Sequence, residues 1–358
     1  MKSEKFCFSR YFMYFCTPLT ILQKMRKKFL WFISGLAIIA ACAAGFAYYL
    51  VSAKVPYAAV EHDGLIFVDQ YDTAESIRTK TALGWRWDIY SKLFSFRPRT
   101  GRYRVYPEMT GLQLYRLLRN GTQEPMKLVV PSARTMNKLA SVLSQSLMAD
   151  SAEIASALTD SQFCAKYGYT TETIPALFIP NTYEVYWDIS VEKLVERMVR
   201  ENNRFWTSER KAKAEALGLT HNEVATLASI VDEETANNAE KPMIAGLYLN
   251  RLRKGMLLQA DPTVKFAVGD FTLRRILGKH LKVESHYNTY LVEGLPPGPI
   301  RIASVAGLEA VLNHTKHNYL YMCAKEDFSG THNFAATLQE HQRNARRYIH
   351  ALNERGIR

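Results

Sequence analysis

Cysteine is scarce in this sequence and stands in no pattern that suits redox or metal chemistry. There are five cysteines in 358 residues, and Cys7, Cys16 and Cys42 lie before or inside the first long apolar run. Cys164 and Cys323 follow it without a CxxC pair and without the spacing of metal ligands. They could form one disulfide in an extracytoplasmic domain, but we expect two unpaired, buried thiols. No metal site is predicted.

Other signatures of common enzyme classes are also missing. The sequence has no glycine-rich phosphate loop, no GxSxG elbow and no kinase motif. Its basic residues form no concentrated stripe interleaved with aromatic residues, so we expect no nucleic-acid partner. No cofactor is predicted either.

Charge is absent from residues 30–51, LWFISGLAIIAACAAGFAYYLV, which are 22 residues long. At about 1.5 Å per residue, such a helix can cross a hydrocarbon core of about 30 Å. Residues 1–29 carry seven Lys or Arg and one acidic residue, which is half of the formal net charge of +12. The positive-inside rule therefore predicts a single-pass inner (cytoplasmic) membrane protein with residues 1–29 in the cytoplasm and the remainder outside. A cleaved signal peptide is the alternative.

The run Met25-Arg26-Lys27-Lys28 directly before the apolar segment is typical of a natural protein start. We therefore expect residues 1–24 to be an upstream extension that comes from a misassigned start codon. Finding these residues in the native protein by N-terminal mass spectrometry would contradict this expectation.

After the apolar run, strand and helix signals alternate up to about residue 215. Residues 65–68, 103–106 and 126–130 read as strands. Residues 176–190 read as a turn-rich aromatic segment. Helices are expected after the caps Thr73, Thr110 and Thr135 and over residues 152–167 and 191–206.

An acidic residue on an apolar helix face is the most informative feature of the chain. Leu227, Ile230 and Val231 recur at helical spacing. Glu234 follows them by seven, four and three residues, so it lies on the same face. Burial disfavours a charged carboxylate, so its pKa should rise above about 4.3. A raised pKa suits a general acid that works near neutral pH.

The neighbouring acids offer a plainer explanation. Asp232 and Glu233 should project from the flanks of this helix, which we expect to end near residues 237–238. Glu234 could then be a helix-end charge that pairs with Arg251 or Arg253. A second helix is expected from Pro242 to Gly255, and a charged, solvated helix over residues 338–358.

Four segments in this order resemble the MltG/YceG-like endolytic murein transglycosylases: LASIVDEETA, LYLNRLRKGMLLQADPTV, SHYNTYLVEGLPPGPI and GTHNF. The resemblance covers most of the chain after the apolar run. In that family the catalytic acid is the last glutamate of the first motif, which corresponds to Glu234 here. The resemblance implies a mixed α+β fold, helix-rich around the catalytic groove.

The later motifs supply candidate substrate contacts. Asp261 precedes a proline and therefore also reads as a helix N-cap. The SHYNTY segment carries hydroxyl and amide groups on a loop shaped by glycine and proline, which suits hydrogen bonding to sugars. His286 stands where the family usually has proline and is left out. The expected contacts are Gln259, Asp261, Tyr287, Asn288, Thr289, Tyr290, His332 and Phe334.

The resemblance also suggests how the chain is divided. Residues 52–123 resemble the LysM-like subdomain of the family, and residues 124–358 its YceG-like catalytic domain. LysM-type modules bind glycans that contain N-acetylglucosamine. Alternatively, residues 52–123 only pack against the catalytic domain and set its distance from the membrane.

The implied activity is non-hydrolytic cleavage of the bond between N-acetylmuramic acid (MurNAc) and N-acetylglucosamine (GlcNAc) in peptidoglycan, which leaves 1,6-anhydro-MurNAc ends. The family is linked to the termination of nascent glycan strands, so partners in the cell-wall synthesis machinery are implied. Two alternatives stay open. One is a muramidase that uses Glu234 and Asp261 with water. The other is a non-catalytic, membrane-anchored peptidoglycan-binding protein.

Overall fold

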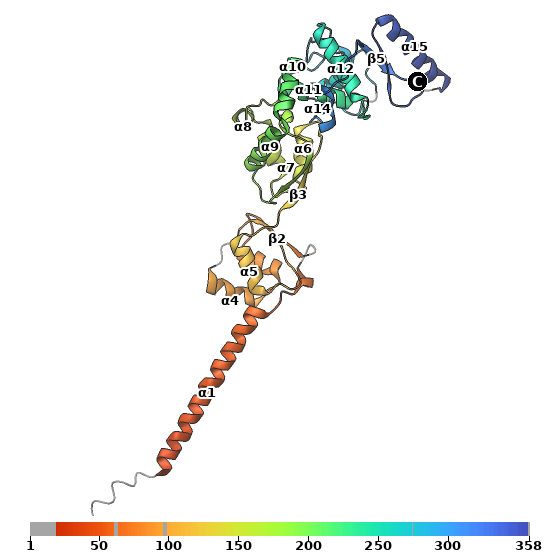
Figure 1. The fold of residues 1–358 in the computed structure, drawn as a ribbon. Helices are drawn as coiled ribbons and strands as arrows, with labels where there is room; N and C mark the ends of the chain where they lie inside the picture. Colours follow the sequence, from red (N-terminus) through yellow and green to blue (C-terminus); the bar gives the residue numbers. More distant parts are fainter. Residues whose placement is uncertain (1–18, 61–63, 96–98, 274, 357–358) are drawn as a thin grey trace, which may run out of the picture. The chain divides into compact units, whose positions relative to one another are not determined.

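The computed structural model describes residues 19–60, 64–95, 99–273 and 275–356 (Figure 1). Most of the proposed upstream extension, residues 1–18, lies outside the described residues. The chain forms two compact units, Met1–Glu124 and Pro125–Arg358, which we describe one at a time. Helices dominate both units, and each sheet is a two-stranded antiparallel pair. The expectation of a mixed, helix-rich α+β fold is thus confirmed.

The first unit begins with one long helix, α1 (Leu19–Ser52), drawn as an uninterrupted rod in Figure 1. Its segment Gln23–Ser52 is long and apolar enough to cross a membrane, and the most apolar part of the segment has a mean hydropathy of 2.1 and is not buried inside the structure. The helix starts before the uncharged run, because the lysines and arginine at 24–28 favour helix as well. It fits a single-pass membrane anchor.

The described remainder of the first unit contains a strand pair packed with helices. Strands β1 (Leu65–Val68) and β2 (Gly101–Arg104) pair antiparallel, and the second strand ends two residues earlier than expected. Helices α3 (Ala74–Thr81) and α5 (Gly111–Asn120) are capped by Thr73 and Thr110, as predicted. Helix α4 (Trp85–Phe94) was not predicted. It packs Trp87 and Tyr90 against Tyr115 in the core.

The second unit starts with a strand pair covered by helices. Strand β3 (Met126–Val130) pairs antiparallel with β4 (Asn181–Val185), so the predicted turn-rich segment contains a strand. The expected single helix over 152–167 is two helices, because Asp160 ends one and caps the next. The helices of this layer are α6 (Met136–Leu143), α7 (Ser151–Thr159), α8 (Ser161–Lys166) and α9 (Val191–Phe205).

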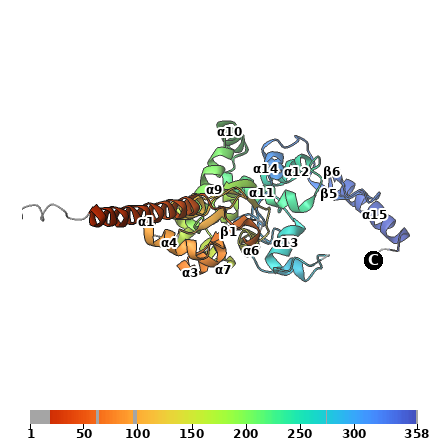
Figure 2. The same ribbon diagram turned by 90° about the horizontal axis from the view of Figure 1, so that it is seen from below.

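The acidic residues Asp232, Glu233 and Glu234 belong to a layer of helices that has its own hydrophobic core. It consists of α10 (Ser208–Leu217), α11 (His221–Glu234), α12 (Lys241–Arg253), α13 (Asp261–Val268) and α14 (Val305–Leu312). Helix α11 packs against both α12 and α14. A hairpin of β5 (Tyr321–Ala324) and β6 (His332–Ala335) follows, and α15 (Leu338–Glu354) lies beside it (Figure 2).

Candidate active site

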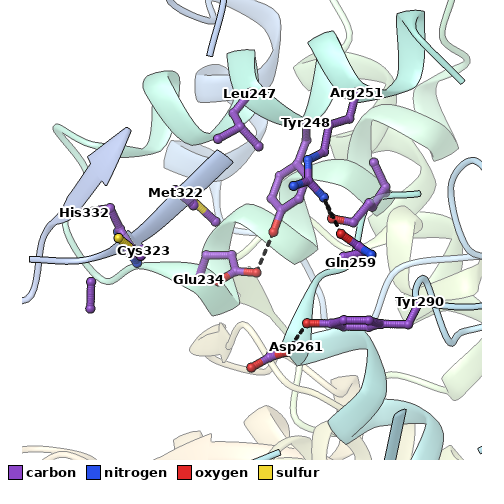
Figure 3. A pocket seen from close by; sticks show the side chains of 12 residues that line it. Glu234, Leu247, Tyr248, Arg251, Gln259, Asp261, Tyr290, Met322, Cys323 and His332 are labelled. Atoms are coloured by element: carbon purple, nitrogen blue, oxygen red, sulfur yellow. Dashed lines mark hydrogen bonds between the residues drawn. The ribbon is translucent and has the colours of Figure 1, made fainter. Parts of the chain in front are cut away.

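Glu234 is the last residue of α11, three to four residues before the predicted end of that helix. The end of a helix carries partial negative charge and free carbonyl groups, which disfavour a nearby carboxylate. The Glu234 side chain lines a cavity of about 220 Å³ (Figure 3). The wall of this cavity also comprises Leu247, Tyr248, Arg251, Leu258, Gln259, Asp261, Tyr290, Met322, Cys323, Ala324 and His332.

The environment of Glu234 favours its neutral form. Part of the side chain faces the cavity, but protein atoms surround it, and this burial is the main cause that raises its pKa to about 7. The Tyr248 hydroxyl donates a hydrogen bond of 2.6 Å to Oε1 of Glu234 and opposes the rise (Figure 3). The charges of Asp261 and Glu233 add to it, whereas His332 lowers the pKa. A carboxyl with a pKa near 7 can both donate and accept a proton at neutral pH.

The two acids before Glu234 are held by cations. Arg134 binds Glu233 through Nε at 2.8 Å and Nη2 at 2.7 Å, and Nη1 of Arg301 adds a third contact at 2.9 Å. Burial alone would raise the pKa of Glu233, but the two arginines outweigh it and hold the pKa below its usual value. Three adjacent carboxyl groups thus have separate environments, and among the described residues Glu234 alone of the three forms no ion pair.

Asp232 joins three helices and is more buried than a flank position suggests. Its carboxylate lies 2.7 Å from Nζ of Lys241 on α12, with side chains 3 % and 7 % exposed. It also accepts hydrogen bonds from the backbone N–H and hydroxyl of Ser304, which caps α14, at 2.6 and 2.8 Å. A Cβ at Gly307 would lie 2.6 Å from Oδ1 of Asp232, so this glycine permits the close approach of α14.

Arg251 does not pair with the acidic cluster. It is buried and donates to the carbonyls of Leu320, Leu257 and Leu258 at 2.6, 3.1 and 2.8 Å, and to Oε1 of Gln259 at 3.3 Å. It therefore ties α12, the segment before α13 and the segment before β5 into one cavity wall. Arg253 is bonded to Asn250 instead, so the predicted alternative of a Glu234–arginine pair is wrong.

Asp261 is the first residue of α13 rather than its N-cap, which is Ala260. The prediction of an N-cap fails because a tertiary partner takes the carboxylate: the Tyr290 hydroxyl donates to its Oδ1 at 2.7 Å (Figure 3). Both side chains line the cavity beside Glu234, together with Gln259.

The other polar residues of the SHYNTY loop turn inward. Asn288 is fully buried and donates to the carbonyls of Leu281 and Val283 at 3.0 and 2.8 Å. Thr289 is also buried, and its hydroxyl accepts from the backbone N–H of Ala260 at 3.0 Å. These hydrogen bonds fix the loop against α13. Of the four expected loop contacts, Tyr290 alone lines the cavity.

Tyr287 lies against Phe266, with ring centroids 4.6 Å apart, and lines a separate cavity. On β6, His332 reaches the cavity near Glu234, whereas Phe334 stacks on Tyr319 at 5.8 Å outside it. His332 is held by Glu240, whose carboxylate accepts from its backbone N–H at 2.7 Å and contacts its ring Nδ1 at 3.0 Å.

Sequence reasoning missed Glu240 and Tyr248. Glu240 directly precedes the first residue of α12, and acidic residues favour helix N-termini. This position is the sequence signal that could have pointed to Glu240. The apolar pattern of its helix face assigns Tyr248 to packing, and the pattern cannot show the partner of its hydroxyl, which comes from another helix. The two thiols beyond α1 are free: Cys164 is buried as expected, but Cys323 is only partly buried and lines the cavity.

A second, larger cavity of about 760 Å³ shares Glu234 and Asp261 with the first. Its wall also includes Glu233, Lys265 and Arg275, and three residues of α15 (Tyr348, Ile349 and Leu352). One side of α15 therefore borders this cavity, and the expectation of a wholly solvated helix needs this correction. We call the two cavities together the groove. Among the described residues, no cluster of His, Cys, Asp and Glu is arranged to hold a metal ion.

The sequence profile of the YceG-like family matches residues 64–347. The chain is 37 % identical over 168 residues to an endolytic murein transglycosylase of Bacillus subtilis, covering 47 % of this chain and 46 % of that protein. A Streptococcus pneumoniae protein of the same name is 27 % identical over 302 residues, which are 75 % of this chain and 54 % of the relative. The chain thus spans about half the length of these curated relatives.

The structure is also similar to the crystal structure of a YceG-like protein from Listeria monocytogenes. The TM-score is 0.53 at 27 % identity, and the match covers 78 % of this chain and 98 % of that chain. The family profile covers well over half of the sequence and includes Glu234 and the groove residues other than Tyr348, Ile349 and Leu352. The chain therefore belongs to the YceG-like family.

Proposed function

We propose that this chain is an endolytic peptidoglycan lytic transglycosylase that cleaves the MurNAc–GlcNAc bond and leaves 1,6-anhydro-MurNAc ends. The observation that carries the proposal is the position of Glu234, a carboxyl with a pKa of about 7 where two cavities meet. The names of the relatives, endolytic murein transglycosylase, agree with it. Cavities on both sides of the acid suit a strand that continues past the bond that is cut.

In the proposed reaction, protonated Glu234 gives its proton to the glycosidic oxygen as the C1–O bond of MurNAc breaks. The resulting carboxylate takes the proton of the C6 hydroxyl of the same sugar, and the C6 oxygen bonds to C1. One carboxyl group thus acts as acid and then as base, and no water, metal or cofactor takes part. The Asp261 carboxylate stabilises positive charge that develops at C1.

The residues predicted to contact substrate fall into two groups: those that line the cavity beside Glu234 and those that support its walls. We propose that Gln259, Asp261, Tyr290 and His332 contact the glycan, since their side chains line the cavity beside Glu234. Asn288 and Thr289 shape the loop that carries Tyr290, because their polar atoms are used inside the protein. Tyr287 and Phe334 support the walls of the groove from outside the cavity.

We propose further that α1 spans the inner (cytoplasmic) membrane with residues 1–29 in the cytoplasm. The seven basic residues of that segment support this orientation. Residues 52–123 form a LysM-like unit that binds glycan or spaces the catalytic domain, residues 124–358, from the membrane. Termination of nascent strands beside the cell-wall synthesis machinery fits this location.

Product analysis tests the proposed reaction. The full chain, purified in detergent, is incubated with peptidoglycan sacculi, and the released muropeptides are identified by mass spectrometry. We expect internal cleavage with 1,6-anhydro-MurNAc ends. Reducing MurNAc ends in their place would overturn the transglycosylase reaction.

The second candidate is a muramidase in which Asp261 activates water. The presence of Asp261 beside Glu234 in both cavities favours it, since hydrolases of this kind use two carboxyl groups. In that case Asp261→Asn stops the release of reducing ends. A transglycosylase with the same substitution still produces anhydro ends, though more slowly.

The pH dependence should follow the protonation of Glu234. Because the acid form starts the reaction, kcat/KM is expected to fall about tenfold per pH unit above the pKa of about 7. A carboxyl with an ordinary pKa of 4.5 would place this decline more than two units lower. Initial cleavage rates between pH 5 and pH 9 measure it. A rate that stays constant from pH 6 to pH 9 would exclude Glu234 as the acid.

Two variants should move this decline in opposite directions. Tyr248→Phe removes the hydrogen bond that lowers the pKa of Glu234, so the decline is expected at higher pH. Asp261→Asn removes a negative charge that raises the pKa, so the decline is expected at lower pH. The same rate profiles, with each variant compared with wild type, give both shifts. If both variants shift the decline in the same direction, the opposite effects of Tyr248 and Asp261 on the pKa of Glu234 are contradicted.

A further inference from the structure

A strongly basic cavity lies next to the groove. It has a volume of about 480 Å³, and we call it the basic cavity. Its wall contains three cationic side chains, Arg134, Lys138 and Arg301, and Glu233 is the one acid that binds them among the residues that the structure describes. The remaining lining includes the apolar side chains Pro131, Val142 and Phe271.

The donors of these three cations are used to different degrees. Each guanidinium nitrogen of Arg301 has a partner: Nε donates to the hydroxyl of Ser132 at 3.1 Å, Nη2 to its carbonyl at 3.0 Å and Nη1 to Glu233 at 2.9 Å. Arg134 uses Nε and Nη2 for Glu233 and lies 5.5 Å from the ring centre of Phe271. Nη1 of Arg134 and Nζ of Lys138 have no polar partner among the described residues. Two charged donors are therefore available for a ligand.

Glu233 connects the basic cavity to the site of cleavage. It binds two arginines of the basic cavity and also lines the larger cavity of the groove, where it precedes Glu234 in the chain. Only the Glu233 side chain would thus separate a ligand in the basic cavity from the groove that contains Glu234. The cavity holds three positive charges against one negative charge, so an anion is the ligand it fits best.

We propose that the basic cavity binds a free carboxylate of the peptide stem carried by the MurNAc residue. This inference rests on the proposed function, because peptidoglycan is its premise. The sugar rings of a stem-bearing strand are neutral, and the stem supplies the carboxylates. Phe271, Val142 and Pro131 offer apolar contacts to the stem's aliphatic side chains. The substrate class is then a stem-bearing strand with free carboxylates.

The test uses full chain carrying Glu234→Gln, which binds strands without cutting them. One probe is uncrosslinked glycan strands with intact stems. The other is the same strands after carbodiimide and ammonia have converted the stem carboxylates to amides. Because charge-assisted hydrogen bonds are strong, we expect the intact strands to bind about tenfold more tightly.

Adding Lys138→Gln should reduce this ratio to about threefold or less, whereas Lys193→Gln on the exposed face of α9 should keep it at about ten. Equal binding of both strands, or a ratio that survives Lys138→Gln, would overturn the inference. Neither result affects the proposed function, which the anhydro products of wild-type protein decide separately. Absence of binding to both strands would count against both.

Discussion

Glu234→Gln is expected to lower the rate of strand cleavage by about a thousandfold or more. General acid–base catalysis contributes about 10²–10⁴ to a rate, and here one group acts in both proton transfers. Glutamine keeps the shape of the side chain and can still accept the hydrogen bond of Tyr248, but its amide cannot supply the proton. Release of muropeptides from sacculi, measured over hours at neutral pH, gives the rate.

The same substitution at Glu215, an exposed residue of α10, is the matched control and should leave the rate unchanged. The far-ultraviolet circular dichroism of both variants should equal that of wild type. A Glu234→Gln variant that still cleaves would require another acid. If wild type and variant are both inactive but bind sacculi equally, the chain is a peptidoglycan-binding anchor instead.

Lys241→Met is expected to lower the local stability of α11 by about 3 kcal/mol or more. The ion pair with Asp232 is buried, with side chains 7 % and 3 % exposed and a distance of 2.7 Å. Removing one partner leaves a buried charge without compensation, which typically costs about 3–5 kcal/mol. Ser304 still donates two hydrogen bonds, which keeps the loss toward the lower end. Native-state hydrogen exchange of the α11 amides measures the change.

A second variant separates the charge from the packing. Combining Lys241→Met with Asp232→Asn removes both charges and should recover most of the lost stability, because the amide oxygen still accepts from Ser304. Lys193→Met on α9 controls for the loss of a lysine at the surface. A loss below about 1 kcal/mol in Lys241→Met would mean that water already screens the pair.

Local signals in the sequence predicted the elements that depend on local chemistry. The threonines before α3, α5 and α6 accept backbone hydrogen bonds of the first turn, so their effect does not need the rest of the fold. The apolar stripe of α11 similarly predicted that Glu234 is turned towards the protein, where it is half-buried and lines the cavity. Strand β4 was not predicted, because its pairing depends on β3, more than 50 residues earlier in the chain.

The composition of a loop could not tell which polar groups face a ligand. Asn288 and Tyr290 belong to the same motif, yet one bonds backbone carbonyls in the interior and the other lines the cavity. Both residues have suitable donors, and only the path of the backbone distinguishes them. The partners of Glu233 and Asp232 are likewise far away in sequence, at Arg134, Arg301 and Ser304.

Those distant partners bear on the order in which the protein folds. Arg134 and Glu233 are 99 residues apart, Asp232 and Ser304 are 72 apart, and Glu240 and His332 are 92 apart. Closing such long loops costs entropy that is offset only after the contacts have formed. We therefore expect these long-range contacts to form late in folding. During synthesis, α11 is complete about a hundred residues before the hairpin that carries His332. The acid thus exists on a finished helix well before its cavity is enclosed.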